Sequence, residues 1–254
     1  MMALQEPPLV VGTTKPAGLA ALAALVPRPW ADRHPDLIEA RLDLARADSG
    51  PNAPLPDLAA YLPACRRLEE TGTPVLLTVR LVADGGRWTE DAARLPLFAS
   101  ALDQRACSWV DIEVESAIAP EVVGRARERG CRAIVSHHDF TGTPPATALG
   151  TIVDRARALG ADIVKVATKV TSLEDHDRLL DLLRARRGEA LAVIGMGAFG
   201  TPLRTYLPCV GSRLTYGFLD EVAAPGQLHA SELVARLMSD CPAYAEARQK
   251  RGAR

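Results

Sequence analysis

The chain has 254 residues, of which 48% are hydrophobic and 24% are charged, and its formal net charge is −1. This length suits one large α/β domain or two small ones, and the mixture of acids and bases leaves no basic face for nucleic acid or an anionic membrane. Residues 1–8 lack a basic region followed by an apolar core, and no later run approaches the roughly 18 apolar residues of a membrane span. We therefore expect a cytoplasmic protein whose partner is a small molecule.

Short apolar runs alternate with segments of helical periodicity, which is typical of a parallel sheet flanked by helices. The predicted strands are 9–14, 36–45, 74–80, 109–115, 131–135, 161–168, 190–194 and 212–219. The predicted helices are 18–26, 91–107, 120–130, 145–160, 172–187 and 227–238. A further helical pattern ends at residue 68, and a short helix holds Arg204.

Eight strand and helix units over roughly 230 residues match a single-domain (β/α)8 TIM barrel in count and length. A doubly wound sheet is the alternative. Short tails at about 1–8 and 243–254 are expected to be flexible, the second because it is polar and basic. The five cysteines are scattered and lack CxxC spacing, so we expect neither a disulfide framework nor a zinc site.

Ionisable residues occur late in the predicted strands, at Arg41, Arg80, Glu113, His138 and Lys165. In a barrel these strand ends meet at one face, where active sites lie. The strand at 36–45 alternates, which should place Glu39, Arg41 and Asp43 on one side. Three buried charges are costly when unpaired, so they should line a polar cavity or pair with each other.

Lys165 lies inside an apolar, β-branched strand and is one of only four lysines among 30 basic residues. A desolvated lysine amine can lose its proton near neutral pH and attack a carbonyl to form a Schiff base, which arginine cannot do. The alternative is a structural lysine at a strand end that reaches water.

His138 ends the preceding strand, so in a barrel it should neighbour Lys165 and could move protons there. His137 should face the opposite way. A structural role for His138 remains open, and a metal site is disfavoured because no set of three ligands accompanies the pair.

Six segments in order resemble the type I 3-dehydroquinate dehydratases of the shikimate pathway. They are EARLD at 39–43, TVR at 78–80 with DGG at 84–86, SHHDFTGTP at 136–144, DIVKVA at 162–167, MGAFG at 196–200 with Arg204, and the stretch from Gly211 through Thr215 to APGQ at 224–227. The resemblance covers the chain from about residue 10 to residue 238.

The resemblance implies an enzyme without metal or cofactor, usually a homodimer, that converts 3-dehydroquinate to 3-dehydroshikimate by syn elimination. Lys165 would form the imine with the ring ketone, and His138 would serve as base and then as acid. Arg204 would hold the substrate carboxylate. The residues that would bind substrate or order the site are Glu39, Arg41, Arg80 and Gln227.

The chain departs from the family pattern at four positions. Asp84 stands where a glutamate normally orients the catalytic histidine, and Leu81 follows Arg80 where Ser or Thr is common. Leu203 and Ala223 each replace a serine near the substrate. These departures bear on rate and affinity more than on the reaction class.

Two other functions fit parts of the pattern. A class I aldolase-like Schiff-base lyase would share Lys165, but no glycine-rich phosphate loop follows the last two strands beyond 195–200. A non-catalytic sensor of a shikimate-pathway metabolite would need neither Lys165 nor His138, so the presence of both residues disfavours it.

Overall fold

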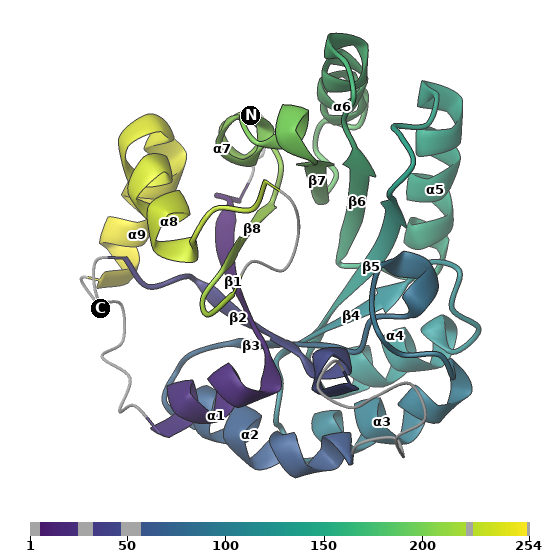
Figure 1. Ribbon diagram of the computed structural model, residues 1–254, viewed down its shortest axis with the longest axis vertical. Helices are drawn as coiled ribbons and strands as arrows, with labels where there is room; N and C mark the ends of the chain where they lie inside the picture. The colour runs from purple at the N-terminus through teal and green to yellow at the C-terminus, as the bar shows by residue number, and fades with distance from the viewer. Residues whose placement is uncertain (1–5, 25–32, 47–56, 222–225, 253–254) are drawn as a thin grey trace.

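A computed structural model describes residues 6–24, 33–46, 57–221 and 226–252 of the chain. Its eight strands form one parallel sheet that curls into a nearly closed barrel with the helices outside (Figure 1). This arrangement confirms the predicted (β/α)8 barrel. In the part of the chain that the structure describes, no helix is both long enough and apolar enough to cross a membrane.

The strands and helices alternate as the sequence predicts. The strands are β1 (Leu9–Thr14), β2 (Leu37–Arg41), β3 (Val75–Thr78), β4 (Trp109–Glu113), β5 (Arg132–Asp139), β6 (Ile163–Lys169), β7 (Leu191–Met196) and β8 (Leu214–Phe218). The α-helices are α1 (Pro16–Ala24), α2 (Leu62–Glu70), α3 (Leu95–Asp103), α4 (Ala119–Glu128), α5 (Ala146–Ala158), α6 (Leu173–Ala185), α7 (Leu203–Cys209), α8 (Ala230–Asp240) and α9 (Pro242–Gly252). Short 3₁₀ turns are η1 (Leu42–Arg46), η2 (Leu58–Tyr61), η3 (Val82–Asp84), η4 (Ala92–Arg94) and η5 (Ala198–Gly200).

The sheet runs in the order β7-β6-β5-β4-β3-β2-β1-β8, so its two ends are β7 and β8. The Arg213 amide donates to the Leu191 carbonyl at 2.7 Å across this seam. The Ser212 hydroxyl accepts from the Val193 amide at 2.9 Å. These bonds bring the two ends of the sheet together. Because all the paired strands are parallel, their carboxyl ends lie on one face of the barrel.

The barrel interior has an apolar floor and a polar upper part, because side chains on each strand alternate between the two faces of the sheet. The floor is built from inward residues at the start of the strands, among them Leu37, Leu76, Trp109, Ile134 and Ile163. The next two inward positions on these strands are mostly polar or charged. Outward residues of the same strands pack against the helices in a separate core.

Several boundaries differ from the sequence prediction. The strand predicted at 36–45 ends at Arg41, and η1 follows, so Asp43 lies on a turn and not on the strand. The helix predicted at 91–107 is η4 followed by the shorter α3. The fifth strand is longer than predicted and carries His138 within it. Ala223 lies outside the described residues.

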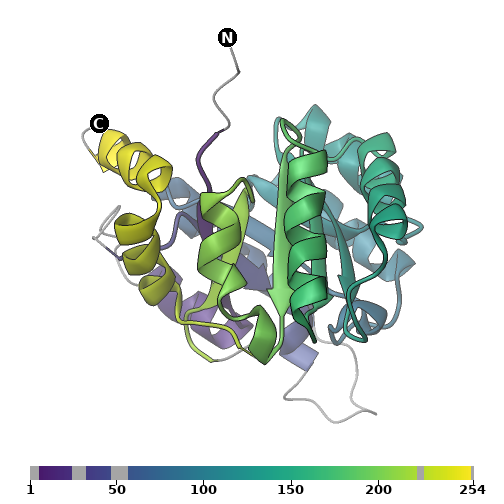
Figure 2. The same ribbon diagram turned by 90° about the horizontal axis from the view of Figure 1, so that it is seen from above.

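Residues 242–252, which overlap the tail expected at about 243–254, form the helix α9 beside α8, both yellow in Figure 2. The Tyr244 side chain is fully buried, and its hydroxyl donates to Asp36 Oδ2 at 2.9 Å. Arg248 pairs with Asp36 Oδ1 at 3.2 Å. The Val10 amide also donates to Asp36 Oδ2, at 2.8 Å. One buried carboxylate, immediately before β2, therefore joins α9 to the start of β2 and to β1.

We expect Asp36→Asn to lower the free energy of unfolding by about 3 kcal/mol, because it leaves the Arg248 guanidinium without its buried counter-ion. Urea unfolding measures the change. The matched control is Glu246→Gln, since Glu246 is exposed on the same helix and should change stability by less than about 0.5 kcal/mol. Equal unfolding midpoints for the parent and Asp36→Asn would show that α9 is held by its apolar contacts alone.

Candidate active site

Lys165 points into the barrel from the middle of β6, and only 5% of the residue is exposed. Its Nζ lies 3.1 Å from Asp111 Oδ2 and 4.3 Å from the centre of the Tyr216 ring. Burial lowers the pKa of the Lys165 amine below its usual value, and the Arg80 charge lowers it further, whereas Asp111 opposes the shift. The amine is therefore easier to deprotonate than an ordinary lysine.

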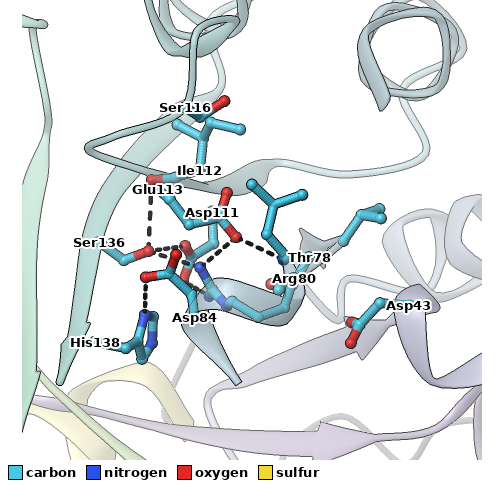
Figure 3. Close-up of polar contacts among 12 residues, drawn as sticks. Asp43, Thr78, Arg80, Asp84, Asp111, Ile112, Glu113, Ser116, Ser136 and His138 are labelled. Atoms are coloured by element: carbon cyan, nitrogen blue, oxygen red, sulfur yellow. Dashed lines mark hydrogen bonds and ion pairs between the residues drawn. The ribbon is translucent and has the colours of Figure 1, made fainter. Parts of the chain in front are cut away.

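Asp111 and Glu113 project inward from β4 and surround the Arg80 guanidinium (Figure 3). Arg80 Nη2 lies 2.8 Å from Asp111 Oδ2, and Arg80 Nη1 lies 3.1 Å from Glu113 Oε1. Ser136 accepts a hydrogen bond from Arg80 and donates one of 2.6 Å to Asp111. Burial alone would raise the pKa of Asp111, but Arg80 and Lys165 lower it, so Asp111 remains a carboxylate.

His138 lies on β5 next to the lysine strand, and its Nδ1 is 3.3 Å from Asp84 Oδ1. Burial, followed by the Arg80 and Lys165 charges, lowers the pKa of His138 well below its usual value, which keeps the imidazole neutral. Burial also raises the pKa of Asp84 to about 6, with a further contribution from Glu113. A neutral imidazole can accept a proton, as a general base must.

Glu39 and Arg41 are the inward residues near the end of β2. Glu39 accepts hydrogen bonds from Thr13 at 2.8 Å and from Thr78 at 3.0 Å. Arg41 makes two bonds of 2.9 Å to Asp43, and this partner outweighs burial and raises the pKa of Arg41. Both expectations for these charges are thus met: Glu39 and Arg41 line a polar cavity, and Arg41 also pairs with Asp43.

Arg204 enters the site from α7 and differs from the other buried arginines of the site in having no carboxylate partner among the described residues. It is 4% exposed, its Nη1 donates to the Tyr216 carbonyl at 3.2 Å, and its buried Nε has no hydrogen-bond partner. Burial lowers the pKa of Arg204 to about 10. A cation in this state is suited to an anionic ligand, and a carboxylate matches the guanidinium fork.

All the predicted site residues line one cavity of about 100 Å³ at the carboxyl ends of the strands. They are Glu39, Arg41, Arg80, Asp84, His138, Lys165, Arg204 and Gln227. His137 and the exposed Lys169 do not line it. Phe140, Ile194 and Met196 add apolar walls. Among the described residues, no group of three or more His, Cys, Asp or Glu is arranged to hold a metal ion.

The sequence reasoning missed Asp111, Ser136 and Tyr216. Asp111 could have been found from strand periodicity, because it lies two residues before Glu113 and must face the same way. Ser136 stands two residues before His138 for the same reason. Tyr216 carried no such signal, since an aromatic residue in an apolar strand is usually part of the core.

A (β/α)8 barrel with a buried amine and a neutral imidazole at the carboxyl ends of its strands defines a barrel enzyme for a small polar substrate. A family model described as type I 3-dehydroquinase matches residues 21–240. The chain belongs to this type I 3-dehydroquinase family.

Several relatives are named 3-dehydroquinate dehydratase. The 3-dehydroquinate dehydratase of Methanosarcina barkeri is 37% identical over 207 residues, which cover 78% of this chain and 82% of that protein. The enzyme of Thermodesulfovibrio yellowstonii is 31% identical over 199 residues, which cover 78% and 83%. The crystal structure of 3-dehydroquinate dehydratase from Geobacillus kaustophilus is similar with a TM-score of 0.76 and 25% identity, over 92% of each chain.

We expect the proton that the site takes up as the pH falls through about 6 to bind Asp84, because the pKa of His138 lies well below that of a free imidazole. Carbon-13 NMR of aspartate carboxyls and nitrogen-15 NMR of imidazoles distinguish the two groups. The Asp84→Asn variant should lack this transition and, if Asp84 orients His138, should have a lower kcat. An imidazolium signal from His138 that appears near pH 6 would contradict the assignment.

Proposed function

We propose that this chain dehydrates 3-dehydroquinate to 3-dehydroshikimate by syn elimination through an imine on Lys165. The observation that carries the proposal is that one cavity joins three groups: the Lys165 amine with a lowered pKa, the neutral imidazole of His138, and the Arg204 guanidinium with no carboxylate partner among the described residues. The three groups match a ketone, an acidic C–H and a carboxylate on one small substrate.

The steps balance with one water lost overall. The Lys165 amine adds to the ketone, and the adduct takes up one proton from solvent and expels water, which leaves a protonated imine. This cation acidifies the adjacent C–H, and His138 takes that proton. The imidazolium then donates the proton to the departing hydroxyl, so that one residue serves both roles on one face of the ring. Hydrolysis of the protonated imine consumes a water, restores the neutral amine and releases the proton that was taken up when the imine formed.

The remaining cavity residues have supporting roles in this proposal. Arg204 binds the substrate carboxylate, and Glu39, Arg41 and Gln227 bind hydroxyl groups or order the site. Arg80 holds neighbouring side chains in place and does not bind substrate, because its Nη atoms already bond to Asp111, Glu113 and Ser136. Asp84 orients His138 through the 3.3 Å contact.

The family also supports proposals about context. We propose a cytoplasmic homodimer that works in the shikimate pathway and needs neither metal nor organic cofactor. Sedimentation analysis tests the dimer. Incubation with 3-dehydroquinate and observation of the conjugated enone's ultraviolet absorbance tests the reaction, and no dehydration by the parent protein would favour the sensor alternative.

We expect borohydride, added with substrate or product, to trap a covalent adduct on the peptide that contains Lys165. The reason is that the amine is buried in the cavity with a lowered pKa. Peptide mass spectrometry locates the adduct. Lys169 is the internal comparison, since it lies on the same strand but is exposed. An adduct on Lys169 would refute the assignment.

We expect His138→Ala to lower kcat by about 10²–10⁴ while imine trapping on Lys165 continues, which is the usual effect of losing a general acid and base. Steady-state kinetics and borohydride trapping measure the two effects. The control is His137→Ala, because His137 is adjacent in sequence but does not line the cavity. A large loss in the His137 variant with a near-normal His138 variant would reverse the assignment.

A further inference from the structure

Arg94, at the end of η4, is a fully buried arginine just outside the barrel wall and is 1% exposed. Its Nη1 donates to the Val79 carbonyl and to Glu113 Oε2, both at 2.6 Å. Its Nη2 donates to Asp91 Oδ1 at 2.5 Å and to Ser116 at 3.0 Å. A charge that has been removed from water at such a cost requires a compensating partner, and Glu113 is the buried one.

Glu113 is shared between two arginines. Its Oε2 binds Arg94, whereas its Oε1 accepts from Arg80 Nη1 and from the Leu81 amide, each at 3.1 Å. Arg80 in turn pairs with Asp111, which also contacts Lys165. The contacts therefore form a continuous chain of alternating charge from Arg94 through Glu113, Arg80 and Asp111 to Lys165.

Two arginines in this network face two buried carboxylates, and the partly exposed Asp91 adds a further carboxylate at its outer end. Because Arg94 binds Glu113, Arg80 is available to neutralise Asp111. We propose that Arg94 is a positioning residue for the reaction: by holding Glu113, it leaves Arg80 to Asp111 and so prevents Asp111 from acting as a full counter-ion to an ammonium on Lys165. The inference rests on the proposed function, in which the Lys165 amine is the nucleophile.

The other groups that face Lys165 do not remove the effect of Arg94 on the Lys165 ammonium. Glu39 on β2 is held by two threonine hydroxyls, and Arg41 and Arg204 add positive charge to the same cavity. His138 on β5 and Tyr216 on β8 are uncharged, because burial lowers the pKa of His138 and raises the pKa of Tyr216. Asp84 also lines the cavity, and its pKa is raised to about 6.

Loss of the Arg94 charge should raise the pKa of Lys165 in two ways. It removes a positive charge from the outer end of the network that reaches the ammonium, and it draws Arg80 toward Glu113, which frees Asp111 to stabilise the ammonium. Loss of the Glu113 charge has the opposite effect, since Asp111 is then the one carboxylate among the described residues that still pairs with Arg80. A residue with only a structural role would not produce shifts of opposite sign.

The test measures the reactivity of the amine without substrate. The protein is labelled with a trace of acetic anhydride across a range of pH, and mass spectrometry follows each lysine, of which the chain has only four. In Arg94→Met, we expect the labelling midpoint of Lys165 to move to higher pH by about half a unit or more, with about threefold slower labelling at neutral pH. In Glu113→Gln, the midpoint should move to lower pH.

The control variants distinguish an effect of the lost charge on Lys165 labelling from an effect of damage to the fold. The double variant Arg94→Met with Glu113→Gln should return the Lys165 midpoint toward that of the parent, and Arg94→Lys should keep it because the charge is retained. Lys169 serves as the internal reference in every variant. If Arg94→Met does not fold, Glu113→Gln and Arg94→Lys still decide the matter. Shifts of the same direction, or none, would overturn the proposal.

The kinetics distinguish this inference from the proposed function. If the parent dehydrates 3-dehydroquinate but Lys165 labelling does not respond to Arg94 or Glu113, only the inference fails. If labelling responds as expected but the parent does not dehydrate the substrate, the proposed function fails. If both hold, the low-pH limb of kcat/KM should move to higher pH in Arg94→Met, in parallel with the labelling midpoint.

Discussion

The site depends on the buried chain of alternating charges that runs from Arg94 to Lys165 through the barrel wall. Removing each charge from water costs several kcal/mol, and mutual pairing at best offsets that cost. Replacement of buried ion pairs by well-packed apolar residues of similar volume is often neutral or stabilising in proteins. The chain of alternating charges is therefore better explained by the lowered pKa of Lys165 at its inner end than by stability.

The space above the amine comes from the sheet register. Lys165 pairs in register with Ser136 on β5 and with Ala192 on β7, so small side chains flank it on both neighbouring strands. Ala167, the next inward residue of β6, is also small and lines the cavity. Below Lys165, Ile163 belongs to the apolar floor. The Lys165 amine thus lies between the apolar floor and the open upper part of the barrel. Burial there lowers the pKa of the amine and still leaves it accessible to a small ligand.

The barrel could be predicted because its strands are apolar and separated by helical periods, and Lys165 stood out because lysine is scarce. The rest depended on partners far away in sequence. The helix α9 was missed because its anchor, Asp36, precedes Tyr244 by more than 200 residues. Arg94 resembled a surface arginine on a predicted helix, and only its contact with Glu113 gives it a role. The end of β2 was misplaced because Asp43 continues the alternation of Glu39 and Arg41 into the turn.

The turn that carries Asp84 follows Arg80, so it connects the group beside His138 to the charges around Lys165. Asp84 is one methylene shorter than the glutamate that the family resemblance implies, yet its carboxylate lies 3.3 Å from His138 Nδ1. The turn is tight: Gly85 has a φ of +78°, and a Cβ on Gly86 would lie 2.0 Å from the Arg80 carbonyl. The Trp88 amide donates to that same carbonyl at 3.1 Å.

The backbone of Arg80 therefore supports the turn that carries Asp84, while its guanidinium belongs to the charge chain that ends at Lys165. A displacement of this one strand end would change the orientation of His138 and the protonation of Lys165 together.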